Sequence, residues 1–113
     1  MPPCLPPGSS LHEPIYLEIG YNKNIKPQRI NPDENGIINI RVKELERLVI
    51  HFSEGTRGLA PLPPGSTFDS KKGIFYWQLG VGFIGEYRLV FLEKDQNSTI
   101  RKRIAKITIL PEY

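Results

Sequence analysis

The stretch that decides the fold runs from Leu62 to Phe91 and reads LPPGSTFDSKKGIFYWQLGVGFIGEYRLVF. It combines turn-forming and aromatic residues and contains almost no side chain suited to acid–base chemistry. Successive side chains of a strand point to opposite faces, so Phe75 and Trp77, two positions apart, are expected to lie together on a core face. The stretch therefore predicts the middle of a β-sheet and not an enzyme loop.

Two turns punctuate this stretch. Pro63, Pro64 and Gly65 are expected to stop one strand and fix a bend, because proline cannot donate to a sheet ladder. The sequence DSKKG predicts a second turn, in which Asp69 accepts backbone N–H groups and Gly73 takes a left-handed conformation. Strands separated by such turns are typical of an antiparallel sheet.

The rest of the chain continues the alternation with a period of two. Residues 13–21 alternate, and residues 37–52 are predicted to form two strands joined by a tight polar connection around 43–46. Residues 85–94 and 100–110 are predicted to form two further strands. Six or seven short strands without helical periodicity predict an antiparallel sandwich or barrel. The segments predicted as loops are residues 22–36 and 53–66.

The same residues form a pattern that resembles a known family. Between roughly Val42 and Ile109, the chain is similar to the immunoglobulin-like and cadherin-like (dystroglycan-type) repeats of bacterial and archaeal surface proteins. In these repeats a leucine–proline and a glycine precede an aspartate turn, which is followed by Gly-x-Phe-x-Trp, Gly-x-Tyr and an alternating strand. The residues that match this pattern are Leu62, Pro63, Gly65, Asp69, Gly73, Phe75, Trp77, Gly85 and Tyr87.

The resemblance implies an immunoglobulin-like antiparallel β-sandwich of about seven strands. Tyr87, at the start of a strand, stands where such sandwiches place a tyrosine corner. Cys4 is the only cysteine, so no disulfide can bracket Trp77, and apolar packing must hold the two sheets together. The expected core contains Trp77, Phe75, Leu48, Ile50, Tyr87, Leu89 and Ile107.

Length and composition predict one domain from the 113 residues. Residues 1–12 are rich in proline and predict a linker or strap, and residues 13–113 predict the single sandwich domain. The net charge of +3 is too small by itself to indicate nucleic acid as a partner. The chain has no run of roughly eighteen apolar residues and no secretory signal pattern at its start, so we expect no membrane insertion by this segment.

The sequence contains few residues of catalytic or metal-binding type. His12 and His51 are the only histidines, and His51 is predicted to point outward from its strand. No nucleophile elbow, phosphate loop, dinucleotide fingerprint or zinc spacing is present. Asp33 and Asp95 are isolated, whereas a calcium ion takes about six to eight oxygen ligands. We therefore expect no enzyme activity, no cofactor and no metal site.

Two surface features are candidate binding sites. The cations of Arg101–Lys106 alternate along a strand and are divided between two faces, which favours a solvated or edge strand over a nucleic-acid site. Sandwich modules also bind sugars through exposed aromatic side chains, and the candidates here are Tyr16, Tyr21, Phe75, Tyr76, Trp77 and Phe83. Because Phe75 and Trp77 are expected in the core, the predicted surface patch consists of Tyr21, Tyr76 and Phe83.

The resemblance implies a non-catalytic module of a larger secreted or surface protein, located outside the cell or on its surface. Such a module acts as a spacer, an adhesive or a protein-interaction domain, with neighbouring domains of its own chain or another surface protein as partners. The alternative is a carbohydrate-binding sandwich module whose partners are glycans. The two interpretations share a fold and differ in whether aromatic side chains line up on the outside.

Overall fold

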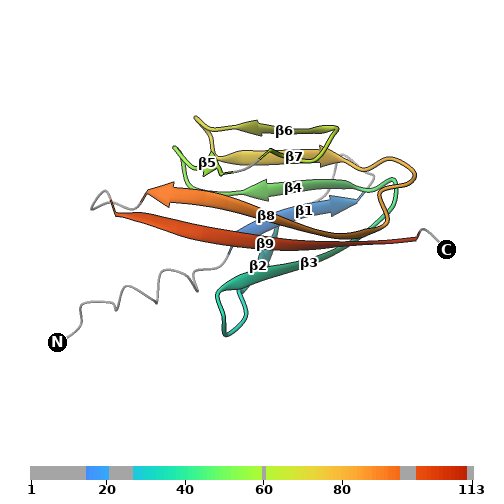
Figure 1. The fold of residues 1–113 in the computed structure, drawn as a ribbon, viewed down its shortest axis with the longest axis horizontal. Helices are drawn as coiled ribbons and strands as arrows, with labels where there is room; N and C mark the ends of the chain where they lie inside the picture. The colour runs from blue at the N-terminus through green and yellow to red at the C-terminus, as the bar shows by residue number, and fades with distance from the viewer. Residues whose placement is uncertain (1–14, 21–26, 60, 95–98, 112–113) are drawn as a thin grey trace.

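The computed structural model describes residues 15–20, 27–59, 61–94 and 99–111. The described residues form strands and connecting turns and no helix. The strands lie in two sheets packed face to face, which confirms the predicted all-β sandwich (Figure 1). Their bounds are β1 Ile15–Gly20, β2 Gln28–Ile30, β3 Ile37–Lys43, β4 Arg47–His51, β5 Arg57–Gly58, β6 Ser66–Asp69, β7 Ile74–Gln78, β8 Gly85–Lys94 and β9 Ile100–Leu110.

The strand order is that of an immunoglobulin-like sandwich. One sheet has the order β2-β1-β4-β7-β6, and the other has the order β3-β9-β8-β5. When β1 and then β4 to β9 are lettered A to G, the first sheet contains A-B-E-D and the second contains G-F-C, as in the immunoglobulin fold. β2 and β3 are additions to this set. Among the described strands, β3 and β9 pair in parallel and every other pairing is antiparallel.

The predicted connection at residues 43–46 is confirmed, but the two strands that it joins lie in different sheets. Leu45 has a positive φ of 72°, and the backbone N–H of Glu46 donates to the carbonyl of Lys43 at 3.2 Å. Glu46 Oε1 accepts from the backbone N–H of Lys43 at 2.7 Å. The chain crosses from one sheet to the other at this corner. β3, before the corner, lies beside β9, and β4, after it, lies between β1 and β7. The two strands therefore contribute to the core from opposite sides.

Three short strands are not among the predicted strands: β2 and β5 lie in segments predicted as loops, and β6 lies between a predicted loop and the turn that begins at Asp69. β2, β5 and β6 are three, two and four residues long, too short for an alternating pattern to be recognised. Their positions are fixed by partner strands: Ile30 of β2 pairs with Ile15, and Phe68 of β6 pairs with Phe75. Their presence raises the strand number above the predicted seven.

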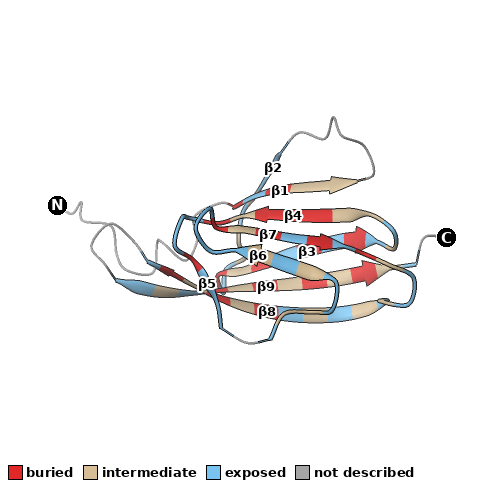
Figure 2. Ribbon diagram, turned by 90° about the horizontal axis from the view of Figure 1, so that it is seen from above, coloured by how far each residue is buried: buried red, intermediate tan, exposed pale blue. Residues whose placement is uncertain are grey.

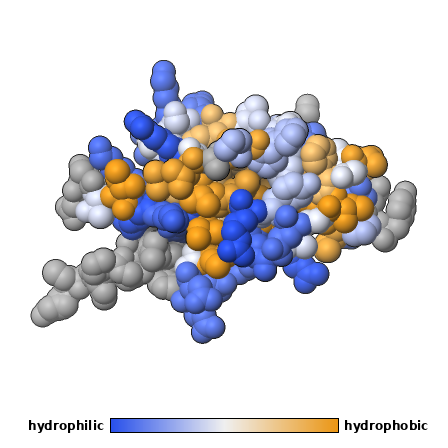
Figure 3. All heavy atoms as spheres, in the orientation of Figure 1, coloured by the Kyte–Doolittle hydropathy of each residue, from blue (hydrophilic) through white to orange (hydrophobic). Residues whose placement is uncertain are grey.

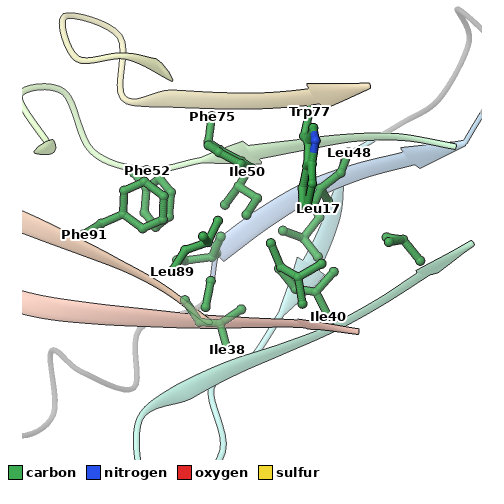
Figure 4. Close-up of a cluster of buried hydrophobic side chains, with 14 of the residues drawn as sticks. Leu17, Ile38, Ile40, Leu48, Ile50, Phe52, Phe75, Trp77, Leu89 and Phe91 are labelled. Carbon is green, nitrogen blue, oxygen red and sulfur yellow. The ribbon is translucent and has the colours of Figure 1, made fainter. Parts of the chain in front are cut away.

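The core is built from the inward positions of both sheets, and its residues fall mainly on the central strands (Figures 2 and 4). Six of the seven predicted core residues are buried. The seventh, Tyr87, is half-buried and packs edge-on against Trp77, with ring centroids 5.2 Å apart. The buried cluster consists of Ile15, Leu17, Ile38, Ile40, Val42, Leu48, Ile50, Phe52, Phe75, Trp77, Leu79, Leu89, Phe91, Ala105, Ile107 and Ile109.

The turn before β7 has the predicted geometry. Asp69 Oδ1 accepts the backbone N–H groups of Lys71 at 3.0 Å and Lys72 at 3.2 Å. Gly73 has a φ of 72°, and its carbonyl accepts the N–H of Phe52 at 2.7 Å. A Cβ added at Gly73 would lie 2.1 Å from the carbonyl oxygen of Ser53. The turn thus requires glycine both for its conformation and for the close approach of the chain that follows β4.

We expect Gly73→Ala to lower the free energy of unfolding by about 2–3 kcal/mol, because a strained left-handed residue and an overpacked contact add together. Urea unfolding measures the change. The matched control is Gly82→Ala, since Gly82 also has a positive φ, 95°, but open space where its Cβ would lie. The control should cost only about 1 kcal/mol of backbone strain. Equal losses in the two variants would contradict the role of the close approach.

Candidate functional site

The outer face of the β2-β1-β4-β7-β6 sheet carries two exposed tyrosines. Tyr16 lies in register with His51, while Tyr76 lies in register with Val49, so the tyrosines flank β4 on one face. Tyr16 is 50% exposed and Tyr76 is 37% exposed. From strand and residue spacing, their Cα atoms are about 11–12 Å apart. We call this surface the tyrosine face; it consists of Tyr16, Glu18, Val49, His51, Ile74 and Tyr76.

A histidine–carboxylate pair lies between the two tyrosines. His51 Nε2 and Glu18 Oε2 are 2.5 Å apart, and both side chains are partly exposed. His51 points outward, as predicted. In the described part of the chain, no serine, threonine or cysteine forms a hydrogen bond with the His51 ring. The pair therefore supplies an oriented polar group to the tyrosine face and not the nucleophile–base contact of covalent catalysis.

The predicted sugar-binding aromatics are not brought together as a set. Tyr21 lies outside the described residues. Phe83 is half-buried in the loop between β7 and β8 and packs edge-on against Trp77, with ring centroids 5.9 Å apart. Tyr76 instead shares its face with Tyr16. Alternation alone places Tyr16 outward, but the strand order that unites Tyr16 with Tyr76 is not visible in the sequence.

The remaining motif residues shape the fold around Trp77. The N–H of Ser66 donates to the carbonyl of Pro63 at 3.1 Å, which closes the predicted bend, and Gly65 has a φ of 85°. This bend presents the carbonyl of Pro64 to the indole Nε1 of Trp77, which donates to it at 3.1 Å. The buried indole thereby has a partner for its only polar atom.

The basic run 101–106 forms part of β9, and one prediction about it is wrong. Alternation is confirmed: Lys102 and Lys106 point outward, whereas Arg101 and Arg103 point inward. However, β9 lies between β3 and β8, so it is not an edge strand, and Arg103 is 1% exposed. Sequence reasoning identified the alternation but could not place the partner strands that cover the inward side.

The inward arginines face a buried acidic residue that the sequence did not indicate. Glu93 of β8 is 4% exposed, and its Oε1 lies 3.5 Å from Arg103 and 3.9 Å from Arg101. Its Oε2 accepts the hydroxyl of Ser53 at 2.8 Å and the backbone N–H of Ser53 at 3.2 Å. This cluster ties the segment after β4 to the other sheet. It is a structural link at one end of the sandwich.

Three observations bear on other kinds of site. Among the described residues, no three histidine, cysteine, aspartate or glutamate side chains are grouped so that they could hold a metal ion. The same residues contain no helix of the length and hydropathy needed to cross a membrane. A hollow lies beside the sheet opposite the tyrosine face, and it is lined by Gly55, Arg57, Leu92, Glu93, Lys94 and Ile100.

The sequence matches no protein-family model, and no curated protein matches it.

Proposed function

We propose that the protein is a non-catalytic immunoglobulin-like module of a larger secreted or surface protein, related to the cadherin-like repeats that its sequence resembles. In this role it acts as a spacer, an adhesive or a protein-interaction unit. The observation that carries the proposal is the path of the chain, which enters the sandwich at one end and leaves it at the other. Modules joined in series through such ends form an extended rod.

Contacts between the sheets identify the two ends. β1 begins beside the end of β4, where the bonds of Ser53 to Glu93 link the sheets. β9 finishes at the opposite end, where the carbonyl of Leu110 accepts the N–H of Glu44 at 2.9 Å, just before β4 begins (Figure 1). The described entry and exit points are thus separated by the length of the strands. This geometry supports a role in spacing.

A tandem fusion of two copies tests the spacer role. Small-angle X-ray scattering should give a maximum dimension close to twice that of one copy, because the connection points lie at opposite ends. The second copy is expected to add little to the cross-sectional radius. A compact particle with the two sandwiches side by side would contradict the proposal.

The second candidate function is carbohydrate binding at the tyrosine face. The observation that favours it is the pair of exposed rings, Tyr16 and Tyr76, on one side of the sheet with the His51–Glu18 pair between them. Aromatic side chains provide rigid apolar area with a polar tip, which suits the alternating apolar and hydroxylated surface of a sugar chain. This candidate uses Tyr76, as predicted, but pairs it with Tyr16 in place of Phe83.

A glycan array separates the two functions. If the tyrosine face binds a glycan, Tyr16→Ala and Tyr76→Ala should each weaken binding by at least about tenfold, the size of effect typical of a buried aromatic anchor. The control is Val81→Ala, because Val81 is 78% exposed and lies in the loop between β7 and β8. Glycan binding that survives both tyrosine substitutions, or no binding to any glycan, would remove this candidate.

A further inference from the structure

The outer face of the β3-β9-β8-β5 sheet gathers cations that are dispersed in the sequence. Cross-strand register places Arg88 opposite Lys106, Lys102 opposite Leu92, and Leu92 opposite Arg57. Hydrophilic side chains lie beside a band of apolar ones over β8 and β9 in Figure 3. We call this surface the basic face; its cations are Arg41, Lys43, Arg57, Arg88, Lys94, Lys102 and Lys106.

The charge of the basic face differs in sign from that of the other residues. Among the described residues, it holds seven of the thirteen lysines and arginines but only one of the nine aspartates and glutamates, Glu86. The other described residues therefore hold six basic and eight acidic side chains. The charge of the face is thus +6, and that of the other described residues is −2. One further carboxylate, that of Asp33, lies at the margin of the face and accepts hydrogen bonds from Asn35, Ile37 and Asn39.

One cross-strand pair on this face places two like charges opposite each other. Arg88 and Lys106 stand directly opposite each other, and like charges in that position destabilise a sheet. Glu86, which is 52% exposed, pairs with Lys106 at 3.3 Å, and an exposed ion pair of this kind contributes about 0–1 kcal/mol. Violations of a local rule are expected at functional sites. The pair is thus a second observation, independent of the charge count, that points to an anionic ligand.

The arrangement of the cations indicates the shape of that ligand. Outward residues along a strand recur about every 6.6–6.8 Å. The cations lie in two groups along the strands, which are separated by the apolar row of Val90, Ile104 and Ile37. A linear polymer lying along β8 and β9 could contact both groups. The strand residues of this face include no aromatic side chain. Proteins that bind single-stranded nucleic acids stack bases on aromatic rings, and this face offers no such platform. The face therefore suits a linear polymer recognised through its charges.

We propose that the basic face binds an acidic polysaccharide, a linear sugar polymer carrying carboxylate or sulfate groups. The charge complementarity of the face and the lack of stacking groups favour this class over nucleic acid. The binding surface is distinct from the tyrosine face and lies on the opposite sheet. It gives the proposed module an adhesive role, although binding itself does not depend on the module being part of a larger protein.

The test uses the full chain and two probes, heparin and polygalacturonate, in fluorescence anisotropy at several salt concentrations. Arg41→Gln with Arg88→Gln should weaken binding by at least about tenfold at moderate salt, since each lost cation removes a salt-sensitive contact. The matched control is Lys71→Gln with Lys72→Gln, which removes the same net charge from exposed residues of the turn before β7. The control should change affinity by less than about threefold, because charges beyond a Debye length contribute little.

Two further variants test whether folding and ligand specificity are as expected. Arg88→Gln alone should leave the melting temperature unchanged or raise it, because it removes the repulsion with Lys106, and Tyr76→Ala should leave heparin binding unchanged. Three results would overturn the proposal: no binding to either polysaccharide at moderate salt, equal losses in the Arg41/Arg88 and Lys71/Lys72 variants, or equally tight binding to single-stranded DNA or poly-glutamate of matched charge. The last result would identify a nucleic acid or an acidic protein as the partner.

Discussion

Replacing Trp77 by alanine is expected to lower the free energy of unfolding by about 3–5 kcal/mol, because it removes a fully buried ring and leaves a cavity. The indole packs edge-on against Phe75, Phe83 and Tyr87, with ring centroids 6.4, 5.9 and 5.2 Å away. It also donates the hydrogen bond to Pro64 that anchors the bend before β6. Equilibrium unfolding in urea, followed by circular dichroism, measures the loss.

The neighbouring position provides the control for this substitution. Tyr76→Ala changes the adjacent residue of β7 on the outer face, and it should cost less than about 1 kcal/mol. Trp77→Phe should fall between the two, since it retains a ring but loses the N–H donor. A Trp77→Ala variant that unfolds near the wild-type midpoint would contradict the assignment of Trp77 to the centre of the core.

The second large effect is expected at Glu93. Replacing Glu93 by alanine should lower the free energy of unfolding by about 3–5 kcal/mol, because it removes the carboxylate that faces two inward arginines in a buried site. Arg103, which is 1% exposed, would keep its charge without that carboxylate. Ser53 would also lose the acceptor of two hydrogen bonds. Urea unfolding measures the loss.

The exposed pair on the same strand is the control for Glu93. Glu86→Gln removes the ion pair with Lys106, where Glu86 is 52% exposed, and it should change stability by less than about 1 kcal/mol. Losses of equal size at the two positions would show that burial does not control the contribution of these carboxylates. A near-native Glu93→Ala variant would contradict the role of the cluster as a link between the sheets.

The fold could be predicted wherever a strand was long enough for its side chains to alternate. β1, β3, β4, β7, β8 and β9 were all predicted, and the turn at Asp69 and Gly73 followed from residue chemistry. The short strands β2, β5 and β6 were missed because pairing with a neighbour, and not local sequence, determines them. The placement of β3 and β4 in different sheets is likewise a long-range property that alternation does not show.

The candidate sites were less predictable because each depends on residues distant in the sequence. Tyr16 and Tyr76 meet only through the order of β1, β4 and β7. The inward arginine Arg103 of β9 faces Glu93 of β8, which also accepts a hydrogen bond from Ser53 in the segment after β4. The basic face was missed for the same reason. The sequence shows alternation within residues 101–106, but the other cations of the face lie on strands that only the fold places beside β9.

The most direct test of the proposed function is whether the protein is accessible from outside the intact cell. Cells of the source organism are treated with a membrane-impermeant amine-reactive biotin reagent, and this protein is quantified by mass spectrometry before and after lysis. A known cytoplasmic protein serves as the control for leakage. The account predicts labelling on intact cells, or recovery from the medium, at a level close to that in lysate. Labelling that appears only after lysis, as for the cytoplasmic control, would contradict it.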